Sequence, residues 1–109
     1  MENRISNFAE FWPFYLGEHL NPTNRLLHFI GSSLGLVCWI TFLLTFHLWL
    51  IPLGFVLDYG FAWLGHFLIE KNKPASFRYP LWSFLADWRM WFCILTGKIN
   101  HELKRASIN

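Results

Sequence analysis

Charged residues are scarce in this chain of 109 residues. They make up 15% of the sequence, while 54% of the residues are hydrophobic; an average soluble domain has roughly 25% charged residues. A soluble protein of this size has a large surface for its volume and needs polar side chains to cover it. The deficit therefore favours a membrane protein over a soluble helical domain. The length is enough for a single domain, which we place at 1–109.

Other signals are also missing. The net charge of +2 is too small to indicate nucleic-acid binding, and no basic patch alternates with aromatic stacking residues. Cys38 and Cys93 lie in apolar runs without the spacing of a zinc or redox motif, so we expect buried free thiols. The N-terminal residues lack the apolar core and cleavage site of a secretory signal, so we expect no removal. There is no internal repeat or low-complexity tract.

Long apolar runs are what the chain does contain. Asn21 is a strong helix cap and Pro22 suits the first helical position, so we expect a first span over 22–47. A second span is expected over 53–70. Asp58 lies inside it and should face protein or water, either as a hydrogen-bonding partner of the neighbouring helix or in a functional role. The glycines of Gly31-x-x-x-Gly35 permit close approach of the two helices.

Two shorter apolar segments flank this hairpin. Residues 5–17 contain Pro13 and are shorter than the roughly 20 residues of a span, so we expect an interfacial helix with Trp12 and Tyr15 at headgroup depth. A soluble amphipathic helix packed on a core is the alternative. Residues 80–97 are either a tilted third span or a helix half-buried at the interface. The polar tail, 98–109, should be a short, fraying helix end.

The predicted fold class is therefore all-α, an integral membrane helical bundle built on a transmembrane hairpin. The predicted turn of the hairpin, 48–53, carries no charge, whereas positive residues flank its open end. These residues are Arg4, Arg25, Lys71, Lys73 and Arg78. By the positive-inside tendency the turn lies away from the cytoplasm. We expect a bacterial inner membrane or an endoplasmic reticulum membrane, with the open end at the cytoplasmic boundary.

Helix geometry indicates which histidines can lie close enough to bind one metal ion. His28 and His47 are separated by about 28 Å along one helix, at about 1.5 Å per residue, and cannot share a metal ion. His28 lies near the start of the first span and His66 near the end of the second, so an antiparallel hairpin returns them to the same side. His19 precedes the first span at that end, and His47 is left at the far side beside Trp49.

A metal site is the function that this convergence indicates. Glu70 lies one helical turn beyond His66, and three imidazoles with a carboxylate suit Fe(II), Zn(II) or another first-row ion. The alternative is that each histidine is an interfacial hydrogen-bonding residue. His101 lies on the polar tail, where it is solvated or reaches the site.

A longer pattern of residues carries a resemblance. The pattern is Tyr15-x3-His19-x-Asn21-Pro22-x-Asn24-x3-His28, followed by Gly65-His66-x3-Glu70-x3-Pro74-Ala75. It resembles a family of small membrane proteins whose fungal members are 2-hydroxy fatty acid dioxygenases of phytosphingosine breakdown, and the short bacterial members are most similar. The resemblance implies Fe(II)-dependent oxidation of a 2-hydroxy fatty acid by dioxygen, an α-oxidation that removes one carbon without 2-oxoglutarate.

Carried over by position, the family's histidines fall on His19, His28 and His66, and its acidic position on Glu70. Fungal members tend to have two adjacent histidines where this chain has His19-Leu20. The expected partners are the fatty-acyl substrate, dioxygen and membrane lipid.

Further residues are candidates for substrate binding. Arg25, Lys71 or Lys73 would meet the substrate carboxylate, although the lysines equally suit lipid phosphates. Asn21 and Asn72 would orient metal ligands. The acyl chain would lie along the hairpin between aromatic side chains and enter from the bilayer. Another metal-dependent lipid enzyme, such as a zinc hydrolase, and a non-enzymatic membrane protein remain open as alternatives.

Overall fold

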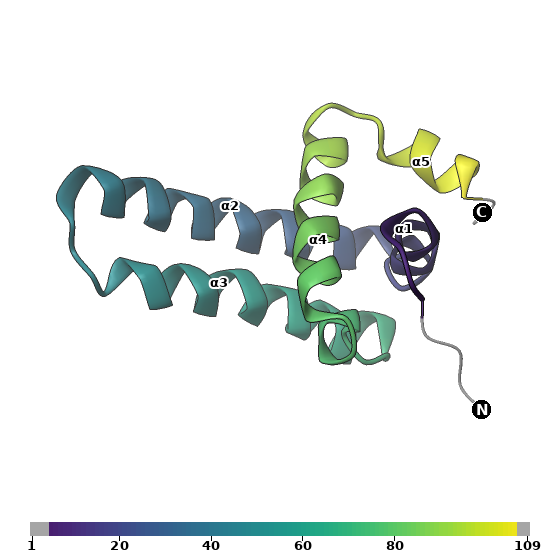
Figure 1. Ribbon diagram of the computed structural model, residues 1–109, viewed down its shortest axis with the longest axis horizontal. Helices are drawn as coiled ribbons and strands as arrows, with labels where there is room; N and C mark the ends of the chain where they lie inside the picture. Colours follow the sequence, from purple (N-terminus) through teal and green to yellow (C-terminus); the bar gives the residue numbers. More distant parts are fainter. Residues whose placement is uncertain (1–4, 107–109) are drawn as a thin grey trace.

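A computed structural model describes residues 5–106. Its elements are α1 (Phe8–Gly17), α2 (Pro22–Thr45), α3 (Leu50–Leu64), a π-helical turn η1 (Gly65–Glu70), a 3₁₀ turn η2 (Ala75–Phe77), α4 (Pro80–Leu95) and α5 (Ile99–Arg105). Helices α2 and α3 form a long hairpin, and α4 crosses it near the open end, beside α1 (Figure 1). The prediction of an all-helical chain organised on a hairpin is confirmed.

The ends of the hairpin helices follow local backbone chemistry. The side chain of Asn21 accepts a hydrogen bond from the Thr23 N–H, and Pro22 occupies the first turn of α2, as predicted. Helix α2 ends two residues earlier than predicted because Phe46 adopts a left-handed conformation with φ of 58°. Helix α3 begins earlier than predicted, since Pro52 falls in its first turn, where a missing N–H costs no hydrogen bond.

Small residues set the spacing between α2 and α3. A Cβ atom added at Gly31 would lie 2.7 Å from the Cβ of Phe61, and one added at Gly35 would lie 2.9 Å from the carbonyl oxygen of Gly54. Both distances are shorter than van der Waals contact. The predicted close approach at this glycine pair is confirmed.

Polar side chains inside the apolar helices are paired with neighbouring elements. Ser32 donates to Oδ1 of Asp58 at 2.8 Å, which joins α2 to α3 and is the structural alternative foreseen for Asp58. Trp91 donates from Nε1 to Oγ of Ser33 at 3.0 Å, which joins α4 to α2. These bonds compensate the desolvation of groups buried in an apolar environment.

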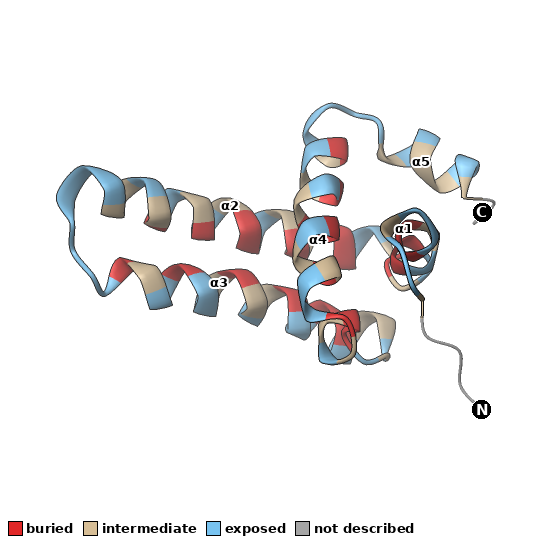
Figure 2. Cartoon of the chain, in the orientation of Figure 1, coloured by how far each residue is buried: buried red, intermediate tan, exposed pale blue. Residues whose placement is uncertain are grey.

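The core lies where α1 and α4 meet the open end of the hairpin (Figure 2). Trp12 and Tyr15 are buried there, with 6% and 1% exposure, because α4 covers this face of α1. Their side chains therefore pack within the protein, as in the alternative of an amphipathic helix packed on a core. Cys38 and Cys93 are buried free thiols, as predicted.

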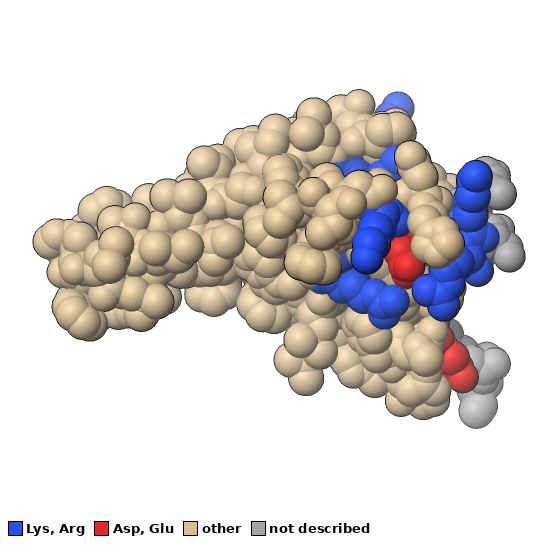
Figure 3. All heavy atoms as spheres, turned by 90° about the horizontal axis from the view of Figure 1, so that it is seen from above, with Lys and Arg blue, Asp and Glu red and all other residues tan. Residues whose placement is uncertain are grey.

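The closed end of the hairpin is exposed and apolar. Leu43, Leu44 and Leu48 are each more than 60% exposed. Asp58 is the only charged residue between Arg25 and Glu70, and on the face seen in Figure 3 the Lys, Arg, Asp and Glu residues gather at the opposite end. Both hairpin helices are long and apolar enough to cross a membrane by length and composition.

The polar tail predicted at 98–109 forms α5, which packs beside α4. Trp12 donates from Nε1 to Oε1 of Glu102 at 2.9 Å, and Arg89 donates to the same oxygen at 3.3 Å. The last three residues of the predicted tail, and Arg4, lie outside the described residues.

Candidate metal centre

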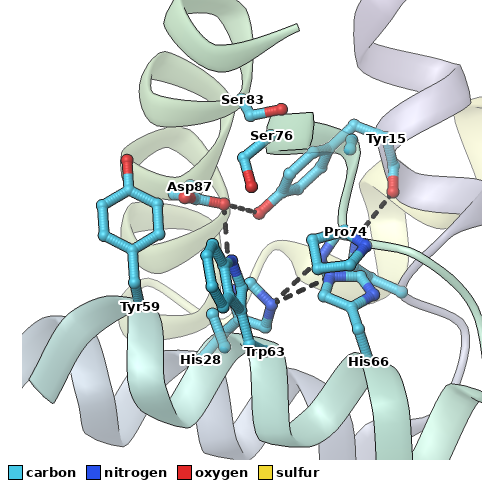
Figure 4. A pocket seen from close by; sticks show the side chains of 12 residues that line it. Tyr15, His28, Tyr59, Trp63, His66, Pro74, Ser76, Ser83 and Asp87 are labelled. Atoms are coloured by element: carbon cyan, nitrogen blue, oxygen red, sulfur yellow. Dashed lines mark hydrogen bonds and ion pairs between the residues drawn. The ribbon is translucent and has the colours of Figure 1, made fainter. Parts of the chain in front are cut away.

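Three histidine side chains meet at the open end of the hairpin. Nε2 of His28 lies 3.1 Å from Nε2 of His19 and 3.3 Å from Nε2 of His66. The three come from the segment after α1, from α2 and from η1, and none is more than 4% exposed. Among the residues that the structure describes, they form the one group of this kind whose ligand atoms lie within 4.8 Å of one another. The predicted convergence is confirmed (Figure 4).

Hydrogen bonds at Nδ1 fix the tautomers of two of these rings. Nδ1 of His19 lies 2.7 Å from the carbonyl oxygen of Tyr15, which can only accept, so this nitrogen carries the proton. Nδ1 of His66 lies 2.7 Å from Oδ1 of Asn72. The amide of Asn72 is oriented by its Nδ2, which donates to the carbonyl oxygen of Glu18 at 3.3 Å. Both rings therefore present a lone pair at Nε2.

Asp87 lies on the Nδ1 side of the third ring, that of His28. Its Oδ1 lies 3.8 Å from Nδ1 of His28 and accepts a hydrogen bond from the hydroxyl of Tyr15 (Figure 4). Burial raises the pKa of Asp87 to about 8; the Tyr15 hydrogen bond opposes this and the charge of Asp58 adds to it. Burial, with Asp87 nearby, raises the pKa of Tyr15 well above 10.0, so Tyr15 remains the donor.

The donor set fits a metal ion. If Nε2 of His28 carried a proton, it could donate to the Nε2 atom of His19 or of His66 but not to both at once. A metal ion between the rings would instead accept the lone pairs of all three Nε2 atoms. Two imidazoles bound at about 2.0–2.1 Å to one ion would place their nitrogens roughly 3.0–3.4 Å apart, which matches the observed 3.1 and 3.3 Å. Burial, then the neighbouring histidines, lowers the pKa of His19 well below 6.5, so it is available in the neutral, metal-binding form.

The backbone around His66 is specialised. It lies in the π-helical turn η1. Such turns are rare in proteins as a whole, and those that do occur are often found at functional sites. The N–H groups of Lys71 and Asn72 both donate to the carbonyl oxygen of His66, and Lys71 adopts a left-handed conformation with φ of 59°. A Cβ atom at Gly65 would lie 1.9 Å from Oδ1 of Asn24, so this position admits only glycine without a shift.

Glu70, the predicted fourth ligand, lies elsewhere. Its Oε1 accepts a hydrogen bond from the backbone N–H of Asn21 at 2.6 Å and one from Nδ2 of Asn24 at 3.5 Å. A carboxylate at this place stabilises the N-terminus of α2. The Glu70 carboxylate is therefore engaged by the start of α2, and it is not part of the group of ligand atoms that the three histidines form among the described residues.

The predicted substrate-binding cations also have other surroundings. Nη1 of Arg25 donates to the carbonyl oxygens of His19 and Leu20, at 2.8 and 2.9 Å, and so holds the segment that carries His19. Lys73 is exposed. The cavity beside the histidines has a volume of about 10 Å³, room for about one water-sized group, and neither cation lines it.

Sequence reasoning did not single out Asp87 or Ser83, which both line this cavity. Asp87 stands behind His28, and Ser83 lines the cavity with a buried Oγ that has no hydrogen-bond partner. The signal for Asp87 was present, because an ionisable residue in an apolar helix indicates a specific role, as was argued for Asp58. His47 lies exposed beside Trp49 at the closed end, as predicted, and His101 is exposed on α5.

Comparison with known proteins supports a specific family. Residues 5–99 match the family described as 2-hydroxy-palmitic acid dioxygenase Mpo1-like. No curated protein and no solved structure matches the chain. The family match covers most of the sequence and includes all three histidines of the cluster. The chain therefore belongs to the Mpo1-like family of 2-hydroxy-palmitic acid dioxygenases.

Proposed function

We propose that this protein is an Fe(II)-dependent dioxygenase that shortens 2-hydroxy fatty acids by one carbon. The observation that carries the proposal is the buried cluster of His19, His28 and His66 in a chain of this family. Three neutral imidazoles leave coordination positions open, which an enzyme of this kind requires. When bound, the iron supplies the redox chemistry with dioxygen and the substrate.

The chain's own residues hold and orient the three ligands. The carbonyl of Tyr15 and the amide of Asn72 hydrogen-bond the rings of His19 and His66 and fix their directions, and the carboxyl group of Asp87 lies 3.8 Å behind the ring of His28. Glu70 acts on this centre indirectly, by anchoring the start of α2 against η1. Burial of the cluster excludes bulk water from the reacting groups.

The polar end of the substrate is the part that suits the histidine cavity. Ser83 offers a buried hydroxyl without a partner there, and a substrate carboxylate or hydroxyl would satisfy it. Among the described residues, no lysine or arginine lines this cavity. We therefore assign the contact with the polar end of the substrate to the Ser83 hydroxyl and not to the predicted cations.

The hairpin is proposed to cross the membrane, with its turn away from the cytoplasm and the histidine cluster near the cytoplasmic boundary. The exposed apolar closed end and the gathering of charges at the open end support this placement (Figure 3). Because α4 runs across the hairpin (Figure 1), we assign it to the interface and not to a third span.

The test combines metal analysis with product analysis. Protein purified without oxygen is loaded with Fe(II) and incubated with dioxygen and 2-hydroxypalmitic acid, and mass spectrometry detects an acid one carbon shorter. Replacement of His66 by alanine should abolish metal binding and turnover, whereas the matched variant His47→Ala at the far end should retain both.

Three outcomes would overturn the proposal. Stoichiometric iron in the His66→Ala variant would show that the ion binds elsewhere. Zinc as the bound metal, with no consumption of dioxygen, would favour a hydrolase. If alanine at all three histidines changed only thermal stability, the protein would be a non-enzymatic membrane protein.

A further inference from the structure

A larger apolar cavity adjoins the histidine cavity. Its volume is about 540 Å³, within the range of about 300–1,000 Å³ that is typical of ligand pockets. It lies between α3 and the segment that includes η2 and the start of α4. Its lining includes Phe55, Tyr59, Gly60, Trp63, Ser76 and Phe77, and has no charged residue. We call it the α3 groove.

The two cavities share part of their walls. Tyr59, Trp63 and Ser76 line both of them. Figure 4 shows Tyr59 and Trp63 rising from α3 and Ser76 on the opposite side of the histidine cavity. A molecule with its polar end at the histidines would pass these three residues and continue into the α3 groove.

We propose that the α3 groove binds the aliphatic chain of the 2-hydroxy acid, and that Gly60 sets the chain length it accepts. This inference rests on the proposed function and adds the location of the hydrocarbon portion of the substrate. The histidine cavity, at about 10 Å³, has no room for a hydrocarbon chain. The adjoining groove is apolar, uncharged and open along α3, which suits a hydrocarbon chain that arrives from the bilayer.

Gly60 is the position at which this idea is most easily tested. A Cβ atom added there would meet no other atom within 4 Å. At Gly54, on the same helix, an added Cβ would lie 2.4 Å from Nε1 of Trp39. A large side chain at Gly60 therefore extends into the groove without displacing the packing between α2 and α3, whereas one at Gly54 would not fit.

The first experiment compares wild type, Gly60→Trp and Val37→Trp on 2-hydroxylauric, 2-hydroxypalmitic and 2-hydroxystearic acids. Val37 is 60% exposed on α2 and lies outside the groove, so its variant controls for a bulky exposed indole. Gly60→Trp should lower kcat/KM for the longer acids relative to 2-hydroxylauric acid by about tenfold or more, the discrimination expected when a few methylenes lose their pocket. The Val37→Trp variant should keep the wild-type ratio.

A second experiment does not depend on turnover. A 2-hydroxypalmitic acid analogue with a photoreactive diazirine at the chain end is cross-linked to wild-type protein in detergent, and the adducts are mapped by mass spectrometry. Adducts should fall on 55–63 and 76–77 and should disappear with excess unlabelled 2-hydroxypalmitic acid. This measurement decides the matter even if Gly60→Trp fails to fold.

The outcomes separate the two proposals. Wild-type protein that turns over no 2-hydroxy acid contradicts the proposed function. An active wild type with an unchanged chain-length ratio in folded Gly60→Trp overturns the α3 groove alone. Competed adducts around Val37 on α2, which does not line the groove, would also overturn it.

Discussion

The direction of the His66 ring depends on one amide. Asn72 accepts from Nδ1 of His66 and is itself held by the carbonyl of Glu18. We expect Asn72→Ala to weaken metal binding about 10–100-fold, because such supporting hydrogen bonds fix the tautomer and the orientation of a ligand. Competition with a chelator of known affinity measures the change. The exposed Asn100 provides the control, Asn100→Ala, which should bind metal as wild type does. Equal affinities for both variants would contradict the role of Asn72.

At the level of single residues, the sequence was informative where helix geometry is regular. The rise per residue and the antiparallel hairpin were enough to bring His28 and His66 together. The spacing of His66 and Glu70 predicts a ligand role for Glu70, whereas in the structure its carboxylate accepts a hydrogen bond from the backbone N–H of Asn21. The π-helical form of η1 has no counterpart in the spacing of its residues. Asp87 could not be placed because its neighbours depend on the direction in which α4 crosses the hairpin.

The contact between α2 and α3 depends on the absence of side chains. A Cβ atom at Gly35 would lie 2.9 Å from a backbone oxygen of α3, which cannot move aside as a side chain can. We expect Gly35→Leu to lower the free energy of unfolding by about 1–3 kcal/mol, the usual cost of overpacking. Thermal unfolding in detergent measures this. Gly60→Ala, on an open part of α3, should be neutral or up to about 1 kcal/mol stabilising.

The attachment of α5 should depend on pH. The indole N–H of Trp12 donates to Glu102 and, together with Arg105 and Arg89, holds the pKa of this carboxyl group below its ordinary value of 4.5, against the opposing effect of burial. A lowered pKa in the folded state means that the docked form prefers the carboxylate. The contribution is present above pH 4.5 and is lost as the pH falls through the lowered pKa.

The protection factors of 99–105 against hydrogen exchange, which are corrected for the intrinsic pH dependence of amide exchange, should therefore fall in acid, while α2 remains protected. In a Glu102→Gln variant the protection of this segment should be lower at neutral pH and should no longer fall in acid. An acid-induced loss of protection that persists in this variant would assign the effect to another group.

Helix boundaries could be predicted where the chain has residues that favour a helix end, such as a capping asparagine followed by proline. Asn21 and Pro22 mark the start of α2 in both the sequence and the structure. The direction of the apolar segment 80–97 does not follow from its sequence, because such a segment is apolar whether it spans the membrane or lies flat. In the structure its helix α4 crosses the hairpin, where Trp91 donates to Ser33 and where Ala86 and Met90 are buried in the core that includes α1.

The whole molecule is polarised along its long axis, and this predicts a topology. Helix α2 has 24 residues, so at about 1.5 Å per residue it is roughly 36 Å long, and its closed end should emerge from a hydrocarbon core of about 30 Å. With Cys38 and Cys93 replaced by alanine, Leu48→Cys should react with an impermeant maleimide only from the far side of the membrane. Asn100→Cys should react only from the cytoplasmic side, and the reverse pattern would contradict the orientation.

The three histidines come from three separate segments of the chain, and this has a consequence for folding. An ion bound at their centre would act as a removable cross-link between the segment after α1, the start of α2 and η1. Anything that binds the native state alone stabilises it, by about 2.7 kcal/mol at a concentration one hundred times the dissociation constant. Cellular metal supply would then set how much of the protein survives quality control, as well as how fast each copy works.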